Sequence, residues 1–471
     1  MAEDMVATLT KRAQVTYAGG SAAFTMLERL ILLYVPFYFL PPREYNLPNL
    51  VPEETFLGLV TILGAALALG RIFDAAADPV VATMSDNLRL GLGRRKPFLL
   101  LSALPLAAFT VLNFNPPYPG QEHLINGIWL ALMMSLFYIA FTAYVNPYLS
   151  LLSELGHTDA TRINLSTLVA LFGLAGMVLI TVIFPEVVSR LQEAGISLRA
   201  SYRFAVAGAA VPSLVLLLLA GLSFKESEHC RPVNSGRLGL KKSLLQVLEV
   251  RPFRRFVLGE IFMQFSMNLV TLGMLYYTVV IFRQEQRFMT VLAALVFGSA
   301  LVAFPFINAA AKKRGKIRIL TLSALVLAFC SMAIFLLSFN MTGVFFYLGV
   351  GLFALAGIPT AAFSILINPT IAEIARSQAI KTGGRREASF FGARAVPLKI
   401  TIAIAGGVFG FLVSTFGRDI ANPLGVQLTL FLVSLSSIGA VLAFWGYPEK
   451  EVQEALQEEE RLFGSRDSGQ Q

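Results

Sequence analysis

Charged residues are scarce in this chain of 471 residues: they make up 14% of it, whereas hydrophobic residues make up 56%. A soluble domain of ordinary composition carries about 25% charged and about 45–50% apolar residues. A chain this long with so few charges cannot cover its surface with polar groups in water. The composition therefore excludes an ordinary soluble enzyme or DNA-binding module and favours a protein that crosses a membrane.

Cysteine and histidine are also scarce, with two and three residues respectively. Cys230 and Cys330 fall in a predicted loop and a predicted span, so they do not indicate a disulfide framework. The chain contains no HExxH, Cys-His cluster or GxSxG motif that would indicate metal or serine chemistry. We therefore expect no enzyme, no cofactor and no resident metal ion.

Long apolar runs are what the sequence does contain. Each transmembrane helix needs roughly 20 apolar residues, and twelve such runs can be placed along the chain. They cover residues 14–40, 55–83, 97–115, 125–153, 163–189, 204–224, 256–282, 288–311, 319–338, 343–374, 389–415 and 424–447. The predicted fold class is an all-α polytopic membrane protein with twelve transmembrane helices.

Lysine and arginine are distributed unequally between the two sets of predicted loops. One side, which includes both termini, holds 27 of them and the opposite side holds 7. Basic loops stay in the cytoplasm, so both termini are predicted to be cytoplasmic in a protein of the cell (inner) membrane. The same rule accounts for the net charge of +9, and we expect no nucleic-acid partner. The first apolar run carries charges and no cleavage site, so it is predicted to be a retained span.

A long charged interruption divides the chain into two halves with six predicted spans each. We predict an N-terminal bundle, a central cytoplasmic loop, a C-terminal bundle and a cytoplasmic tail, over residues 1–224, 225–255, 256–447 and 448–471. The basic turn at residues 93–96 has a counterpart at 312–316 in the second half. This recurrence fits a duplicated plan, although two ordinary positive loops would also produce it.

The second predicted span contains three charged residues, Arg71, Asp74 and Asp78. A charged side chain at mid-bilayer costs at least about 2.5–3.5 kcal/mol, which makes such residues functional candidates. Asp74 and Asp78 are four residues apart and share one helix face. Two carboxylates so close repel each other unless a cation lies between them, which indicates a sodium or proton site. The alternative is a structural Arg71–Asp74 ion pair with Asp78 near the water boundary.

Polar residues in other spans are candidates for the same cavity. Lys399 lies deep in the eleventh predicted span, and it could face the two aspartates as a competing positive charge. Glu28 in the first span, and Gln264 and Asn268 in the seventh, are candidates for lining the cavity or for contacts between helices.

Three stretches resemble the glycoside–pentoside–hexuronide:cation symporter family. They comprise residues 70–79 with Ser85-Asp86-Asn87 and residues 93–98, then Thr142 to Tyr148 with Glu154 and Arg162, and finally residues 382–387 leading through Phe390-Phe391-Gly392 to Lys399. The matches cover both halves in the expected order. The resemblance implies the major facilitator fold, with two six-helix bundles and alternating access.

The resemblance also implies roles for individual residues. Asp74 and Asp78 match the family's acid pair at the cation site, Thr142 matches its hydroxyl, and Lys399 matches the lysine near that site. Ala77 replaces the asparagine of that site. Arg71 would balance charge beside Asp74.

The sugar-binding positions of the family are not kept. Its acidic, aromatic and basic sugar ligands align with Thr25, Val145, Leu149 and approximately Ala170. The candidate substrate cavity is therefore assigned to Thr25, Glu28, Asn146, Leu149, Gln264 and Asn268.

The predicted function is symport of a small organic solute with Na⁺ or H⁺, with a sugar or glycoside as the family's default solute. The apolar replacements would also suit a lipid or amphipathic solute. Outside transport, the alternatives are a membrane enzyme, for which no catalytic set is visible, and a non-transporting sensor or channel. The expected partners are the solute, the cation and the bilayer, with the protein acting as a monomer.

Overall fold

The computed structural model describes residues 9–53, 55–56, 60–88, 93–155, 159–229, 249–382, 387–449 and 451–454. These residues are almost entirely helical, and the chain divides into two compact units. Unit 1 comprises residues 1–235, 271–293 and 406–426, and unit 2 comprises residues 236–270, 294–405 and 427–471.

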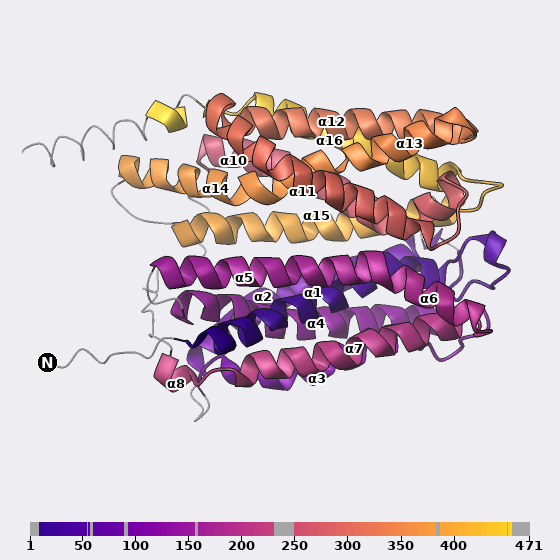
Figure 1. Cartoon of the computed structure of the whole chain (residues 1–471), viewed down its shortest axis with the longest axis horizontal. Helices are drawn as coiled ribbons and strands as arrows, with labels where there is room; N and C mark the ends of the chain where they lie inside the picture. Colours follow the sequence, from indigo (N-terminus) through magenta and orange to yellow (C-terminus); the bar gives the residue numbers. More distant parts are fainter. Residues whose placement is uncertain are drawn as a thin grey trace, which may run out of the picture. The chain divides into compact units, whose positions relative to one another are not determined.

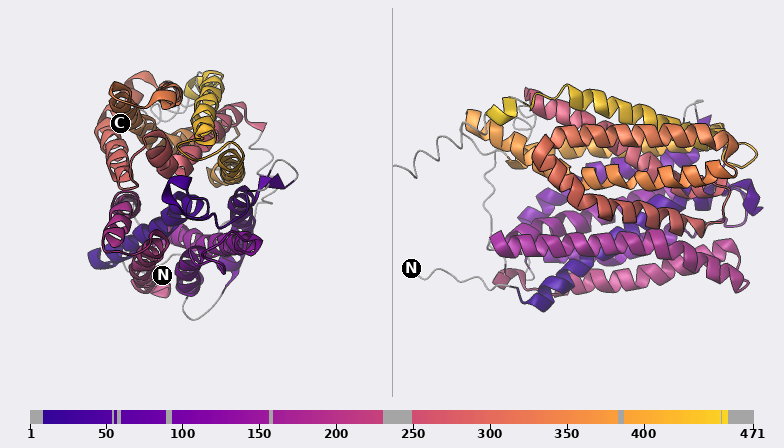
Figure 2. Two further views of the ribbon diagram at one scale, coloured as in Figure 1. Left: turned by 90° about the vertical axis from the view of Figure 1, so that its right-hand side faces the viewer. Right: turned by 45° about the horizontal axis from the view of Figure 1, so that its top comes forward.

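Unit 1 contains the helices of the first half of the chain (Figure 1). They are α1 (Lys11–Phe39), α2 (Ile62–Asn87), α3 (Lys96–Asn113), α4 (Leu124–Leu155), α5 (Asp159–Val178), η2 (Leu179–Ile183), α6 (Phe184–Glu193), α7 (Leu198–Leu222) and the short α8 (Glu226–His229). Helix α1 packs against α5 and α7, while α4 packs against α2 and α3. The left view of Figure 2 shows these helices close to end-on, in indigo to pink.

Three later segments also belong to unit 1. They are the end of α10 (Arg251–Tyr276) with η3 (Tyr277–Ile281), the start of α11 (Phe288–Arg314), and the end of α15 (Glu387–Thr415) up to the start of α16 (Leu424–Trp445). Tyr276 on α10 donates a hydrogen bond of 2.8 Å to the carbonyl of Leu40, just after α1.

Unit 2 contains the rest of these four helices together with α12 (Lys316–Leu337), η4 (Ser338–Asn340), α13 (Val344–Leu355) and α14 (Gly357–Thr382). Helix α12 packs against both α13 and α14. Helices α13 and α14 follow each other with one residue between them and form a single apolar span over residues 344–378.

Eleven helices are long and apolar enough to cross a membrane, among the residues that the structure describes. Helix α2, with its three charged residues inside the span, is a further long helix. Large apolar side chains are exposed on the outer faces of these helices, for example Leu101 on α3 and Phe306 on α11. A water-facing surface would not carry so many such side chains, so the polytopic all-helical prediction is confirmed.

The predicted start of the second span at residue 55 was wrong. Residues Thr55–Phe56 (β1) and Val60–Thr61 (β2) form a short antiparallel pair, with Thr55 opposite Thr61. Helix α2 starts only at Ile62, because the hydroxyl of Thr61 accepts a hydrogen bond of 3.2 Å from the amide of Gly64. An N-cap of this kind satisfies one free amide of the first turn and fixes where the helix begins.

Candidate functional site

Helices α2 and α4 lie side by side in a register that repeats every four residues. Contacts join Gly70 to Tyr138, Asp74 to Thr142 and Asp78 to Asn146. Each pair is separated by 68 positions in the chain, so the two helices run in the same direction with matched turns. The polar residues of α2 therefore meet those of α4 in successive layers.

Arg71 occupies the first layer. A Cβ atom at Gly70 would lie 2.9 Å from the Tyr138 ring, so only glycine lets this ring approach α2 so closely. The guanidinium of Arg71 lies 4.1 Å from the centre of the same ring, a favourable cation–π geometry. It also forms ion pairs with Glu28 of α1 at 3.1 Å and with Asp74 at 3.5 Å. Arg71 thus links α1, α2 and α4.

The two aspartates occupy the following layers. Asp74 is buried, and its carboxylate accepts a hydrogen bond from the hydroxyl of Thr142. Asp78 is half-buried, and its carboxylate accepts a hydrogen bond of 2.9 Å from the amide of Asn146. The structure thus brings Asn146 to the acid pair, although the sequence had suggested the substrate cavity for it.

In each of the two helices a proline follows the layer formed by Asp78 and Asn146. Pro79 in α2 and Pro147 in α4 are again 68 residues apart. Proline has no amide hydrogen, so the carbonyls of Ala75 and Ala143, four residues earlier, lose their helical donors. Ala75 follows Asp74 in α2, and Ala143 follows Thr142 in α4.

The cluster holds charges of both signs. Glu28, Asp74 and Asp78 are acidic, and the guanidinium of Arg71 forms ion pairs with the carboxylates of Glu28 and Asp74.

The other predicted residues lie in several places. Thr25 on α1 is half-buried and faces Gly173 of α5, and Leu149 on α4 is exposed. In unit 2, Asn268 donates a hydrogen bond of 2.7 Å to the backbone carbonyl of Gln264, one turn earlier on α10. Lys399 is half-buried on α15 in unit 2, and its position opposite the aspartates stays a prediction.

Sequence reasoning missed a buried ion pair in unit 2. The guanidinium of Arg394 on α15 approaches both carboxylate oxygens of Glu260 on α10, at 2.7 and 2.8 Å from its Nε. It also donates a hydrogen bond of 3.0 Å to Asn368 on α14. Each residue was visible in its span, but residues 134 positions apart carry no spacing signal that would have paired them.

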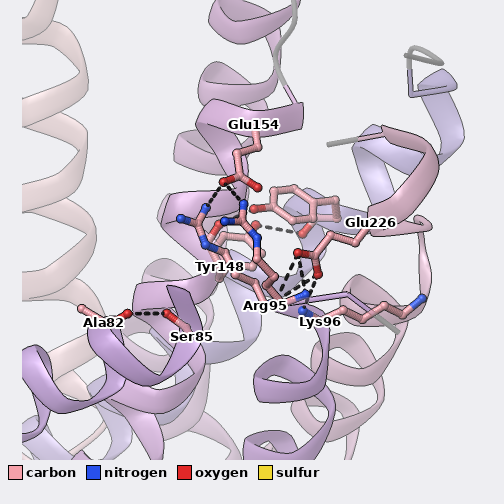
Figure 3. Close-up of polar contacts among 9 residues, drawn as sticks. Ala82, Ser85, Arg95, Lys96, Tyr148, Glu154 and Glu226 are labelled. Atoms are coloured by element: carbon pink, nitrogen blue, oxygen red, sulfur yellow. Dashed lines mark hydrogen bonds and ion pairs between the residues drawn. The ribbon is translucent and has the colours of Figure 1, made fainter. Parts of the chain in front are cut away.

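Two carboxylates, those of Glu154 and Glu226, hold the first basic turn at residues 93–96. We call these two glutamates and the turn the Glu226 cluster (Figure 3). Glu226 accepts hydrogen bonds from the backbone amides of Arg94, Arg95 and Lys96, at 2.8 to 3.2 Å. Glu154, at the end of α4, forms ion pairs with the guanidinium groups of Arg94 at 3.1 Å and Arg95 at 2.8 Å. Both carboxylates are buried.

The second basic turn has related parts. Lys316 forms an ion pair of 2.5 Å with Glu373 of α14. Gly315 has a positive φ of 88°, as Gly93 has one of 109° in the first turn. A Cβ atom at Gly315 would lie 2.6 Å from a carboxylate oxygen of Glu449, and one at Gly93 would lie 2.3 Å from Glu226.

At the opposite end of unit 1, Arg418 connects the segment after α15 to the segment between α1 and α2. Its buried guanidinium bonds to Glu53 at 2.8 Å and to Asn49 at 2.5 Å. Partial burial by itself would raise the pKa of Glu53, but the hydrogen bond and charge of Arg418 outweigh it and lower this pKa. The neighbouring residue Asp419 forms an ion pair with Arg43 at 3.2 Å.

Comparisons with known proteins agree with this architecture. Residues 17–448 match the family described as MFS/sugar transport protein. Inner membrane symporter YicJ of Escherichia coli (strain K12) is 22% identical over 433 residues, which cover 90% of this chain and 87% of that protein. Uncharacterized symporter YnaJ of Bacillus subtilis (strain 168) is 23% identical over 483 residues, which cover 97% and 96%.

A solved structure shows the same fold. The crystal structure of a D-xylose-proton symporter superposes with a TM-score of 0.63 at 16% identity, over 92% of this chain and 97% of that one. The predicted major facilitator fold is confirmed, and so is the prediction that the chain is a transporter rather than an enzyme. The chain belongs to the MFS/sugar transport protein family, as a multi-pass membrane transporter.

Proposed function

We propose that this transporter couples the movement of a small organic solute, of the sugar or glycoside class, to a cation that binds between α2 and α4. The observation that carries the proposal is the layered contact of Asp74 with Thr142 and of Asp78 with Asn146. The symporter names of the two bacterial relatives are consistent with coupling.

Coupling follows from the change in charge between α2 and α4 when the cation binds. An uncompensated charge inside the membrane is expensive, so the empty and cation-loaded cluster favour different conformations and different solute affinities. Na⁺ would be held by the carboxylates, the Thr142 hydroxyl and the carbonyls freed by Pro79 and Pro147. A proton would neutralise one carboxylate instead.

Uptake into proteoliposomes tests the proposal. A sugar and glycoside library is supplied with a sodium gradient or a proton gradient, each imposed separately. Asp74→Asn and Asp78→Asn should each reduce gradient-driven accumulation to background in a folded protein. The matched control is Glu186→Gln, which removes one partly exposed carboxylate from α6. Normal accumulation by the double aspartate variant would contradict the proposal.

Lys399 is proposed to compete with the cation as a counter-charge. Its removal makes the site more negative, so Lys399→Ala should keep or raise cation affinity while coupled accumulation falls. Exchange of solute down its own gradient should survive. A folded Lys399→Ala protein that accumulates solute normally, or that no longer binds cation, would refute this role.

Both termini are proposed to be cytoplasmic. Single cysteines that replace Arg95 and Lys313 should then react only with reagent admitted from the cytoplasmic side, because both basic turns lie on the side that holds 27 of the Lys and Arg residues. Labelling of either cysteine from outside intact cells would require the opposite orientation.

A further inference from the structure

Unit 2 contains an open cavity beside the second basic turn, at residues 312–316, and the function proposed above gives this cavity no role. The cavity has a volume of about 680 Å³. It is lined by the turn between α11 and α12, by two residues of α14 and by the segment after α16. Its size would admit a headgroup that bears a phosphate.

Positive charge dominates the lining. Lys312, Lys313, Arg314, Lys316 and Arg318 all line the cavity, against the two carboxylates of Glu373 and Glu449. The lining therefore carries a net charge of +3. Lys316 is neutralised by Glu373. The other four basic side chains are exposed, and no carboxylate within the described parts of the chain forms an ion pair with them.

In the first basic turn, at residues 93–96, a carboxylate of the chain itself occupies the position that corresponds to the cavity. There, Glu226 occupies the position beside Gly93 and bonds to three backbone amides. In unit 2, Glu449 approaches Gly315, but α12 begins without a side-chain cap. The second turn thus keeps more positive charge and more open space than the first.

The cavity lies where the apolar helix surface ends. Phe306 is 69% exposed on α11, two turns before Lys313, and Trp445 is 80% exposed at the end of α16, two residues before the cavity-lining Tyr447. Tryptophan is enriched at the boundary between lipid and water. The cavity is therefore at the level of the lipid headgroups, and basic pockets at this level between helices suit anionic headgroups.

We propose that this cavity binds the phosphate-bearing headgroup of an anionic phospholipid. Arg314 and Arg318 supply planar guanidinium groups, which bind phosphate oxygens in pairs, and Lys312 and Lys313 add point charges around them. Exposed apolar side chains on α11 and α16 accommodate the acyl chains. The ligand class is a phosphate anion, and the source is the bilayer.

Native mass spectrometry of the full-length protein in detergent tests the proposal. Phosphatidylglycerol and phosphatidylcholine with the same acyl chains are titrated separately, and inorganic phosphate is added as a competitor. We expect phosphatidylglycerol to bind about tenfold more tightly than phosphatidylcholine, because each nearby Lys or Arg contributes to attraction of an anionic lipid. Inorganic phosphate should displace it only at millimolar concentration.

Two variants move the affinity in opposite directions. The triple change Lys312→Gln, Lys313→Gln and Arg314→Gln should weaken phosphatidylglycerol binding about tenfold. Glu449→Gln removes a negative charge from the cavity and should strengthen it, by about threefold. The opposite sign of this second change keeps the test decisive if the triple variant folds poorly.

The matched control removes the same amount of charge elsewhere. Lys11→Gln, Arg12→Gln and Lys225→Gln change three exposed basic residues of unit 1 and should alter binding less than twofold. Equal binding of the two lipids, or an equal loss in the control, would overturn the proposal. Displacement of the lipid by micromolar phosphate would overturn it as well, because the ligand would then be a soluble anion.

Discussion

The two basic turns are built from equivalent residues but differ in how tightly they are closed. Each has a glycine with positive φ, a basic residue paired with a glutamate, and a second glutamate two residues after an aromatic residue. In the Glu226 cluster both carboxylates are buried, whereas Glu373 and Glu449 are partly exposed. The same arrangement of residues therefore gives a turn closed by buried carboxylates at residues 93–96 and an open cavity at residues 312–316.

The difference follows from two positions. Arg95 provides a second guanidinium for Glu154, and its equivalent in the second turn is the buried apolar residue Ile317. Glu226 lies at the start of a short helix and bonds to three amides, while Glu449 accepts a 3.4 Å hydrogen bond from Gln453. Because Glu449 makes fewer hydrogen bonds than Glu226, it does not close the turn at residues 312–316.

Glu154→Gln should have the largest effect on this comparison. It removes a buried charge between two arginines and should lower the free energy of unfolding by about 3 kcal/mol. Glu373→Gln breaks a partly exposed pair and should cost less than about 1 kcal/mol. Thermal unfolding in detergent measures both, and equal losses would show that the two pairs are equivalent.

Glu226→Gln should cause the second-largest loss in the free energy of unfolding. The amide can accept hydrogen bonds through only one of its terminal atoms, so at least one of the three backbone amides loses its partner, at about 2 kcal/mol. Glu449→Gln should change the free energy of unfolding by less than about 0.5 kcal/mol. The same unfolding measurement applies, and a larger loss for Glu449→Gln would contradict the description of the second turn as open.

Substitution of the glycines gives a smaller difference. Alanine at Gly93 or Gly315 is strained by the positive φ, at about 1 kcal/mol each. At Gly93 the new Cβ atom would also displace the bonded carboxylate of Glu226, so Gly93→Ala should cost about 1 kcal/mol more than Gly315→Ala. Combining Gly93→Ala with Glu226→Ala, which removes the carboxylate that the new Cβ atom would meet, should recover part of this excess in a double-mutant cycle.

The smallest difference is expected at the equivalent residues Lys96 and Arg318. The ammonium of Lys96 donates a hydrogen bond of 2.8 Å to the carbonyl of Phe224, while Arg318 is exposed. Lys96→Gln should therefore cost about 1 kcal/mol and Arg318→Gln less than about 0.5 kcal/mol. A Tm that falls as far for Arg318→Gln would show that the second turn depends on its charges for stability.

Parts of the proposed cation site could be predicted because they depend on a single helix. The i,i+4 spacing places Asp74 and Asp78 on one face of α2 whatever packs against it. The partners of these residues could not be predicted from spacing, because Asn146 and Glu28 come from other helices. The shared role of Arg71, bonded to both Glu28 and Asp74, depends on how α1 and α4 approach α2.

Local rules also failed at the start of α2. The apolar run at residues 55–61 is compatible with a helix by composition alone, but its β-branched residues pair as strands and Thr61 caps the helix that follows. Glu226 gave no signal in the sequence either, since it lies in a charged segment with Lys225 and Glu228 and resembles them in composition. Only its hydrogen bonds to the backbone amides of residues 94 to 96, which are 130 to 132 positions away, distinguish it.

The sequence by itself determined that this chain is a helical membrane protein, because apolar length and the lack of charge depend on composition within each segment. It also determined the acid pair, which one helical turn places on one face. Only the tertiary structure decided which carboxylates are closed by hydrogen bonds and which face an open cavity. That outcome depends on distances between helices far apart in the chain, and buried charges are stabilised only by the partners that packing brings to them.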